Sequence, residues 1–135
     1  MDPGFGAAHQ HLGQAYLQKR MFEQAIAQLQ KAVELSGGSP ASTANLARAY
    51  AGSGRRSDAV QLLNELKSRA NSAYSNAPEI AIVYSALGER DEAMMWLDKG
   101  SEERFNPGVL LRPGFDPMRS DPQFRDLAHR AGLRP

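Results

Sequence analysis

The sequence predicts an all-α solenoid of three helix-turn-helix repeats closed by a C-terminal capping helix. Within each repeat, apolar residues recur at spacings of three and four, which gives a helix one buried face. No segment has the pattern of a credible strand. Across repeats, three residue types recur at a step of 34. These are the tyrosines Tyr16, Tyr50 and Tyr84, the alanines Ala25, Ala59 and Ala93, and the leucines Leu29, Leu63 and Leu97. A step of this length is typical of stacked helix pairs, whose surface binds other molecules.

Length and composition set the broad class. The chain has 135 residues, which is near the usual size of one small domain, and 41% of them are hydrophobic. It has no cysteine, so disulfides and thiolate metal sites are excluded. No apolar run approaches the roughly 20 residues that span a bilayer, and the first ten residues lack the pattern of a signal peptide. We therefore expect no membrane partner, and a cytoplasmic location by default.

The net charge of +1 argues against a general attraction to nucleic acid. The charge is unevenly distributed, because residues 75–103 carry seven acidic and two basic side chains between two basic flanks. A solvated outer helix face is the favoured interpretation of this acidic segment, and a charge-steered partner is the alternative.

Each helix is predicted from its apolar spacing and its end signals. In the first two repeats the helices are expected at residues 7–18, 22–35, 40–51 and 57–69. Gly37 and Gly38 suit a helix C-cap, Ser39 can cap the next helix, and Pro40 fits its first turn. In the third repeat, the first helix is expected to start at residue 76 or 77 and to end at Gly88, and the second to span residues 90–103.

Turn residues follow the same step. Gly54 and Gly88 lie 34 residues apart in the turns within the second and third repeats, while the first repeat has Arg20 at this place. A single residue other than glycine is tolerable there.

These residues resemble the tetratricopeptide repeat family, whose pattern has Leu-Gly, then Tyr, then Ala, then an apolar residue. Leu12-Gly13, Tyr16, Ala25 and Leu29 match it best. The bulky first position of the family is occupied by His9, Thr43 and Ala77, so the aromatic residue is missing there. The resemblance implies a right-handed superhelix with repeats at residues 6–39, 40–73 and 74–107. Residues 1–5 are then the remnant of a preceding repeat, and residues 108–135 form a capping segment.

Small residues explain the packing. Gly13, Ala47 and Ala81 in the first helices, and Ala25, Ala59 and Ala93 in the second helices, are expected where two helices approach closely. The tyrosines and leucines fill the remaining volume.

The segment PGFDPMRSDPQFRDL at residues 113–127 resembles the tail that closes tetratricopeptide arrays in multidomain bacterial proteins, among them transcriptional regulators, adenylate cyclases and serine/threonine kinases. Asp116 and Asp121 each precede a proline, which predicts a short turn and then a final helix at residues 122–131 that ends at Gly132. Five apolar side chains are expected to cover the third repeat: Phe115, Met118, Phe124, Leu127 and Leu133. Arg119, Arg125 and Arg130 are expected to face solvent. We favour a capping role for this segment. The alternative is that its arginines bind phosphate, but no glycine-rich anion loop accompanies them.

Signals for catalysis, metals or cofactors are weak, and we predict none of these functions. His9 and His11 are two residues apart, so on a helix they point about 200° from each other and cannot share a metal. His129 stands alone. The carboxylates Glu89, Asp91 and Glu92 lie near a helix start, where the dipole explains them. No nucleophile elbow or phosphate loop is present.

The predicted function is a non-catalytic protein-interaction scaffold that binds a peptide segment or domain of a partner in a concave groove. In the family this groove is lined by first-helix side chains outside the packing positions. The candidate groove residues are Gln10, Gln14, Leu17, Asn45, Arg48, Ile82 and Ser85. Ala51 and Glu79 occupy related positions. The alternative is homodimerisation through an apolar N-terminal edge formed by Phe5, Ala8, Leu12 and Ala15.

One subclass of the family binds the terminal carboxylate of a peptide with Lys, Asn, Asn, Lys and Arg. The matching positions here are Gln10, Gln14, Asn45, Ser75 and Glu79, so only Asn45 fits. A carboxylate would lack cationic partners at these positions. We predict no micromolar binding of an acidic C-terminal pentapeptide.

Overall fold

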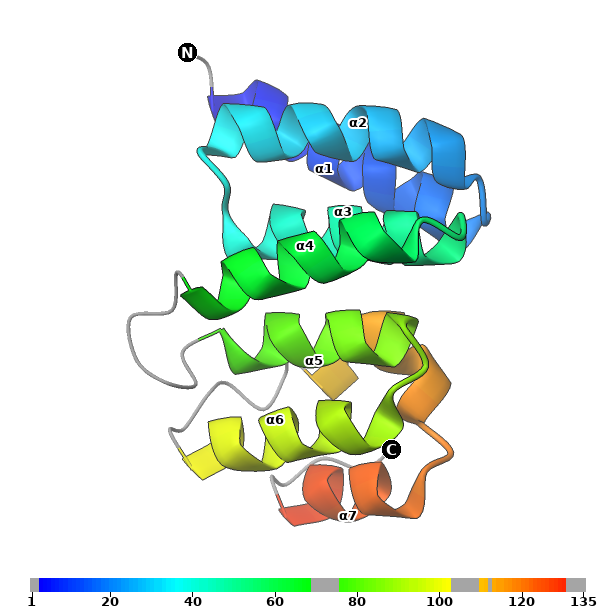
Figure 1. Ribbon diagram of the computed structural model, residues 1–135, viewed down its shortest axis with the longest axis vertical. Helices are drawn as coiled ribbons and strands as arrows, with labels where there is room; N and C mark the ends of the chain where they lie inside the picture. Colours follow the sequence, from blue (N-terminus) through cyan, green and yellow to red (C-terminus); the bar gives the residue numbers. More distant parts are fainter. Residues whose placement is uncertain (1–2, 69–75, 103–109, 112, 131–135) are drawn as a thin grey trace. The chain divides into compact units, whose positions relative to one another are not determined.

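The computed structural model describes residues 3–68, 76–102, 110–111 and 113–130, and every regular element in these ranges is helical (Figure 1). This confirms the all-α prediction. The chain divides into two compact units, which we call unit 1 (residues 1–68) and unit 2 (residues 69–135). A division between helix pairs is natural in a repeat array, because each repeat contacts only its neighbours. The right-handed superhelix over all three repeats stays a prediction.

Unit 1 consists of two helix pairs. The first pair is α1 (Pro3–Gln18) and α2 (Phe22–Ser36), and the second is α3 (Pro40–Gly52) and α4 (Arg56–Ser68). Along the chain each helix packs against the next one, and α1 also contacts α3. Helix α1 begins earlier than the predicted start at Ala7, because Pro3 is already helical. A proline suits this first turn, where its missing N–H needs no partner.

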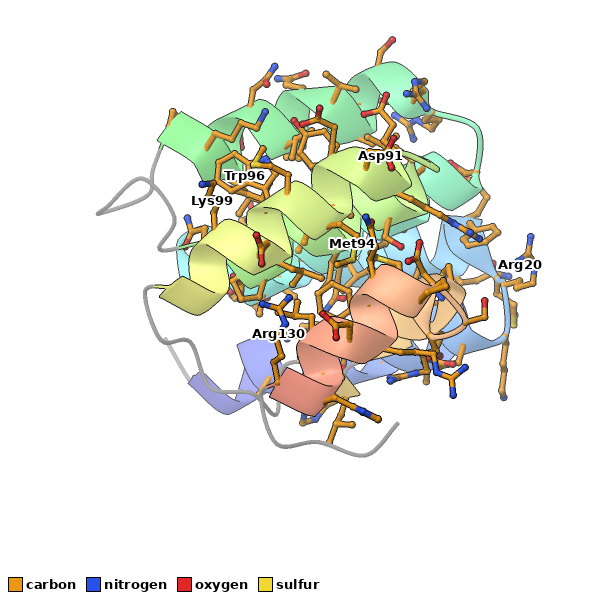
Figure 2. All side chains as sticks on the ribbon, turned by 90° about the horizontal axis from the view of Figure 1, so that it is seen from below. Arg20, Asp91, Met94, Trp96, Lys99 and Arg130 are labelled. Atoms are coloured by element: carbon orange, nitrogen blue, oxygen red, sulfur yellow. The ribbon has the colours of Figure 1, made fainter. Side chains whose placement is uncertain are left out.

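The turn within each helix pair has the same backbone geometry. Arg20, Gly54 and Gly88 have φ angles of 59°, 86° and 80°, in the left-handed region. The next residue in each turn donates its backbone N–H to the carbonyl of the repeat tyrosine, at 2.9, 2.8 and 2.9 Å. The bonds run from Met21 to Tyr16, from Arg55 to Tyr50 and from Glu89 to Tyr84. Arg20, labelled in Figure 2, therefore adopts the conformation that glycine provides in the other two repeats.

Small residues lie where the helices of unit 1 approach closely, as predicted. Ala25, Ala47 and Ala59 are completely buried. A Cβ atom on Gly13 of α1 would lie 2.5 Å from Cγ of Leu29 in α2. The side chain of Phe22 in α2 leaves equally little room for a Cβ atom on Gly52 of α3. A larger residue at either position would force the neighbouring side chain or helix to shift.

The connection from α2 to α3 has the caps that the sequence predicts. Gly37 ends α2 with a φ angle of 70°, and the backbone N–H of Gly38 donates to the carbonyl of Val33 at 2.8 Å. The Ser39 hydroxyl then accepts the backbone N–H of Ser42 at 3.3 Å, and Pro40 is the first residue of α3.

Unit 2 consists of the third helix pair and the C-terminal elements. The pair is α5 (Ala77–Ala86) and α6 (Arg90–Glu102), and it is followed by the 3-10 helix η2 (Pro113–Met118) and by α7 (Pro122–Arg130). Helix α5 packs against α6 and η2, and α6 also contacts α7. The rings of Phe115 in η2 and Phe124 in α7 lie 5.8 Å apart.

The capping prediction is confirmed for the apolar side chains within the described residues. Phe115, Met118, Phe124 and Leu127 are all buried. Leu133 and Gly132, which the sequence also assigned to the cap, lie outside the described residues. Asp121 caps α7 as expected, because its carboxylate accepts the backbone N–H of Gln123 at 2.8 Å.

Two details of the tail differ from the prediction. Asp116 does not precede a helix start, because η2 already begins at Pro113, and its carboxylate pairs with Arg119 at 2.8 Å. Arg119 does not simply face solvent, because its guanidinium also donates to the carbonyls of Leu110 at 3.2 Å and Leu111 at 2.8 Å. A planar guanidinium carries several donors, so it can hold several acceptors of one loop at once.

Candidate functional site

The candidate groove residues of α1 lie on its face near α3. Gln14 is half-buried, and Leu17 is 7% exposed. Gln10 is half-buried as well, and its side-chain oxygen accepts the hydroxyl of Ser42 in α3 at 2.8 Å. This hydrogen bond links the first helices of two successive repeats. Gln10 therefore acts in packing, besides any part it has in a groove.

Asn45 and Arg48 form a pair on α3. The guanidinium of Arg48 donates to the side-chain oxygen of Asn45 at 3.1 Å. Asn45 is buried and Arg48 is half-buried. Arg48 lies 34 residues after Gln14, so the two hold the same place in successive helix pairs. Gln14 and Arg48 are half-buried, and neither makes the hydrogen bond to Ser42 that Gln10 makes.

The candidates of the third repeat lie in unit 2 and are enclosed. Ile82 is 5% exposed, and Ser85 is also buried. Gly114 of η2 lies so close to Ile82 that a Cβ atom on it would be 2.8 Å from Cγ2 of the isoleucine. The structure therefore links Gln10 of α1 to α3 through Ser42, leaves Gln14 and Arg48 half-buried, and places Ile82 in a contact with the C-terminal segment.

The exposed apolar residues of α1 follow the predicted N-terminal edge. Leu12 is 42% exposed, and Ala8 and Ala15 are exposed too. The side chain of Phe5 lies outside the described part of the chain. A run of exposed apolar residues at i, i+4 and i+7 forms one stripe of a helix.

The histidines have ordinary surroundings. Nδ1 of His9 lies 2.7 Å from the side-chain oxygen of Gln28 in α2, which fixes its ring between the two helices. His11 and His129 are exposed. Among the described residues, no group of three or more His, Cys, Asp or Glu side chains could hold a metal ion.

Sequence reasoning did not identify a cleft between α6 and α7. This cleft has a volume of about 500 Å³ and is lined from α6 by Asp91, Met94 and Asp98, and from α7 by Asp126 and Arg130. Figure 2 shows Asp91 and Met94 on α6 and Arg130 on α7. Arg130 lies 3.1 Å from Asp126 and 3.6 Å from Asp98, so it links the two helices through exposed ion pairs. The one sequence feature that could have indicated this cleft was the acidic composition of the third repeat.

Comparison with known proteins finds one similarity to a family. Residues 16–77 match a family model described as Tetratricopeptide repeat. No curated protein and no solved structure matches the chain significantly. Among the described residues, no helix is both long enough and apolar enough to cross a membrane. The matched residues extend from Tyr16 through both helix pairs of unit 1 to Ala77, the first residue of α5. The family match and the helix pairs together show that residues 16–77 are similar to the tetratricopeptide repeat family.

Proposed function

We propose that the chain is a non-catalytic protein-interaction module, and that the first-helix face of unit 1 binds an extended segment of a partner protein. Repeats of this family generally mediate protein–protein interactions, and the family is generally a non-catalytic scaffold. The observation that carries the proposal is the partial exposure of Gln14 and Arg48 at equivalent places on α1 and α3. Two polar side chains repeated at one step suit a ligand that runs across successive repeats.

The chemistry of these side chains suggests what the segment offers. The amide of Gln14 can both donate and accept hydrogen bonds, as the backbone of an extended peptide requires. The guanidinium of Arg48 suits a carbonyl or a single side-chain carboxylate. Asn45 accepts from Arg48 at 3.1 Å and so helps to orient it. Because Ser42 holds Gln10 to α3, the face is already ordered before a ligand binds, which lowers the entropy cost of binding.

A capture experiment with matched variants tests the proposal. The groove variant is Gln14→Ala/Arg48→Glu, and the control is Gln24→Ala/Lys31→Glu. The control makes closely similar changes on α2, where both residues are exposed. We expect the control to retain the partners of the wild-type chain and the groove variant to lose them. A photo-crosslinking residue at position 14 should then join the partner segment directly. Identical capture by the two variants would sink the proposal.

Homodimerisation is the second candidate function. The exposed Leu12, Ala8 and Ala15 favour it, since an apolar helix stripe on a surface is a common contact site. Sedimentation of the wild-type chain over a range of concentrations tests this candidate, with Leu12→Lys as the variant and Met95→Lys as a control on another exposed apolar residue. A chain that stays monomeric at high concentration removes it.

A further inference from the structure

The face of α5 that corresponds to the open face of unit 1 is covered by the chain itself. Ile82 lies 34 residues after Arg48, so it holds the place of Gln14 and Arg48 in the third repeat. Gly114 of η2 lies directly against it, and η2 packs against α5 (Figure 1). A partner segment in unit 1 and η2 in unit 2 would thus occupy equivalent positions.

The contact at Gly114 requires a residue without a side chain. A Cβ atom there would lie 2.8, 2.9 and 3.1 Å from Cγ2, Cγ1 and Cδ1 of Ile82. Ile82 is buried and branched at Cβ, so it has little freedom to turn aside. Gly114 is not among the glycines with a positive φ angle, so its backbone conformation suits other residues. The glycine is needed for close approach to α5.

The covering segment has the features of a bound peptide. Its anchors Phe115 and Met118 are completely buried, and Leu110 is 1% exposed. Arg119 holds its shape through the carbonyls of Leu110 and Leu111 and the carboxylate of Asp116. These three bonds lie within the segment, so they restrict its conformation. A segment that is already ordered loses less entropy when it docks.

We propose that the segment made of residues 110–111 and 113–119 acts as an intramolecular ligand for the first-helix face of α5, so that the surface available to a partner is confined to unit 1. The confinement to unit 1 rests on the function proposed above, whereas the docking of the segment does not. The ligand class is a short segment with a glycine over Ile82 and apolar anchors at the first and fourth positions after it.

The test uses a labelled synthetic peptide with the sequence of residues 110–120 and three forms of the full chain. In the wild-type chain the tethered segment has an effective concentration on the order of mM, so free peptide at about 10 μM should not displace it. In Gly114→Val the tethered segment clashes with Ile82, and we expect the peptide to bind at least tenfold more tightly than to wild type. In Ile82→Ala/Gly114→Val the three clashing atoms are gone. The tethered segment should then dock again and suppress peptide binding.

Fluorescence anisotropy measures peptide binding, and far-UV circular dichroism measures the helix content of each form. Loss of the unit 2 helices in Gly114→Val would overturn the proposal, since the segment would then be an indispensable part of the core. A folded Gly114→Val chain that does not bind the peptide would overturn it as well. Neither result affects the capture experiment at Gln14 and Arg48, so the two proposals fail separately.

Discussion

Replacing Gly13 by alanine tests whether close helix approach stabilises the first repeat. The new Cβ atom would lie 2.5 Å from Cγ and 2.6 Å from Cδ2 of Leu29. Carbon atoms in favourable contact are about 3.5–4.0 Å apart, so one helix or side chain must move by about 1 Å. Leu29 is completely buried, so it has no empty space to move into.

Two effects of opposite sign decide the magnitude. Overpacking a filled core costs about 1–3 kcal/mol, whereas alanine is favoured over glycine within a helix by about 1 kcal/mol. We therefore expect Gly13→Ala to lower the free energy of unfolding by roughly 0–2 kcal/mol, in the upper half of this range because the overlap is severe. For a unit of this size, 1 kcal/mol corresponds to about 4–8 °C in Tm.

Thermal melting monitored by circular dichroism measures the change, and a double-mutant cycle with Leu29→Ala identifies its origin. Leu29→Ala alone should cost about 2–5 kcal/mol through the cavity that it leaves. In a chain that already carries Gly13→Ala, the added Cβ atom points into that cavity, so the loss should be smaller by at least about 1 kcal/mol. A Gly13→Ala chain that melts above the wild type, or an additive cycle, would refute the reasoning.

Three further substitutions have defined outcomes. Arg20→Gly relieves a residue with a side chain of its φ angle of 59°, but it also removes the contact of the guanidinium with the Phe22 ring, whose centroid is 5.5 Å away. We therefore expect the free energy of unfolding, measured in urea, to rise by up to about 1 kcal/mol. A clear fall would mean that the ring contact dominates. Ser39→Ala removes the hydroxyl that caps α3 and should cost about 1 kcal/mol by the same measurement. The control Ser57→Ala, at an exposed serine inside α4, should cost clearly less. Arg119→Ala removes the hydrogen bonds to the carbonyls of Leu110 and Leu111, and their loss should cost about 1.4 kcal/mol and make cleavage of η2 in limited proteolysis about tenfold faster. Arg119→Lys should not restore protection, because an ammonium group lacks the planar fork of a guanidinium. Equal cleavage rates in the wild type and both variants would contradict this role.

The repeat pattern was sufficient to predict most helix ends. Ser39 and Pro40 start α3 and Gly37 ends α2, because caps and left-handed residues act locally and leave a direct mark on the sequence. The alanines at 25 and 59 are buried where the 34-residue step places them. These features depend on neighbours within one repeat, so periodicity reveals them.

The position of Leu110, Leu111 and η2 could not be predicted from periodicity, because these residues follow no repeat. The sequence assigned them to a cap over the third helix pair but did not indicate which face of α5 they cover. One signal was available at Ile82, which stands where the other repeats have Gln14 and Arg48. An isoleucine at a position that is polar elsewhere indicates that this face is covered. Whether Gln10 packs or binds was also beyond the sequence, since its bond to Ser42 joins residues 32 positions apart.

The three equivalent turns have a consequence for the rate of folding. Each is closed by a hydrogen bond between residues five positions apart, from the residue after Arg20, Gly54 or Gly88 back to a tyrosine carbonyl. Such a bond requires closure of only a very short loop, so the entropy barrier to forming a helix pair is low. Chains dominated by local contacts of this kind fold in microseconds to milliseconds. A helix pair can therefore begin to form before any contact between distant repeats exists, and stopped-flow refolding should be largely complete within a few milliseconds.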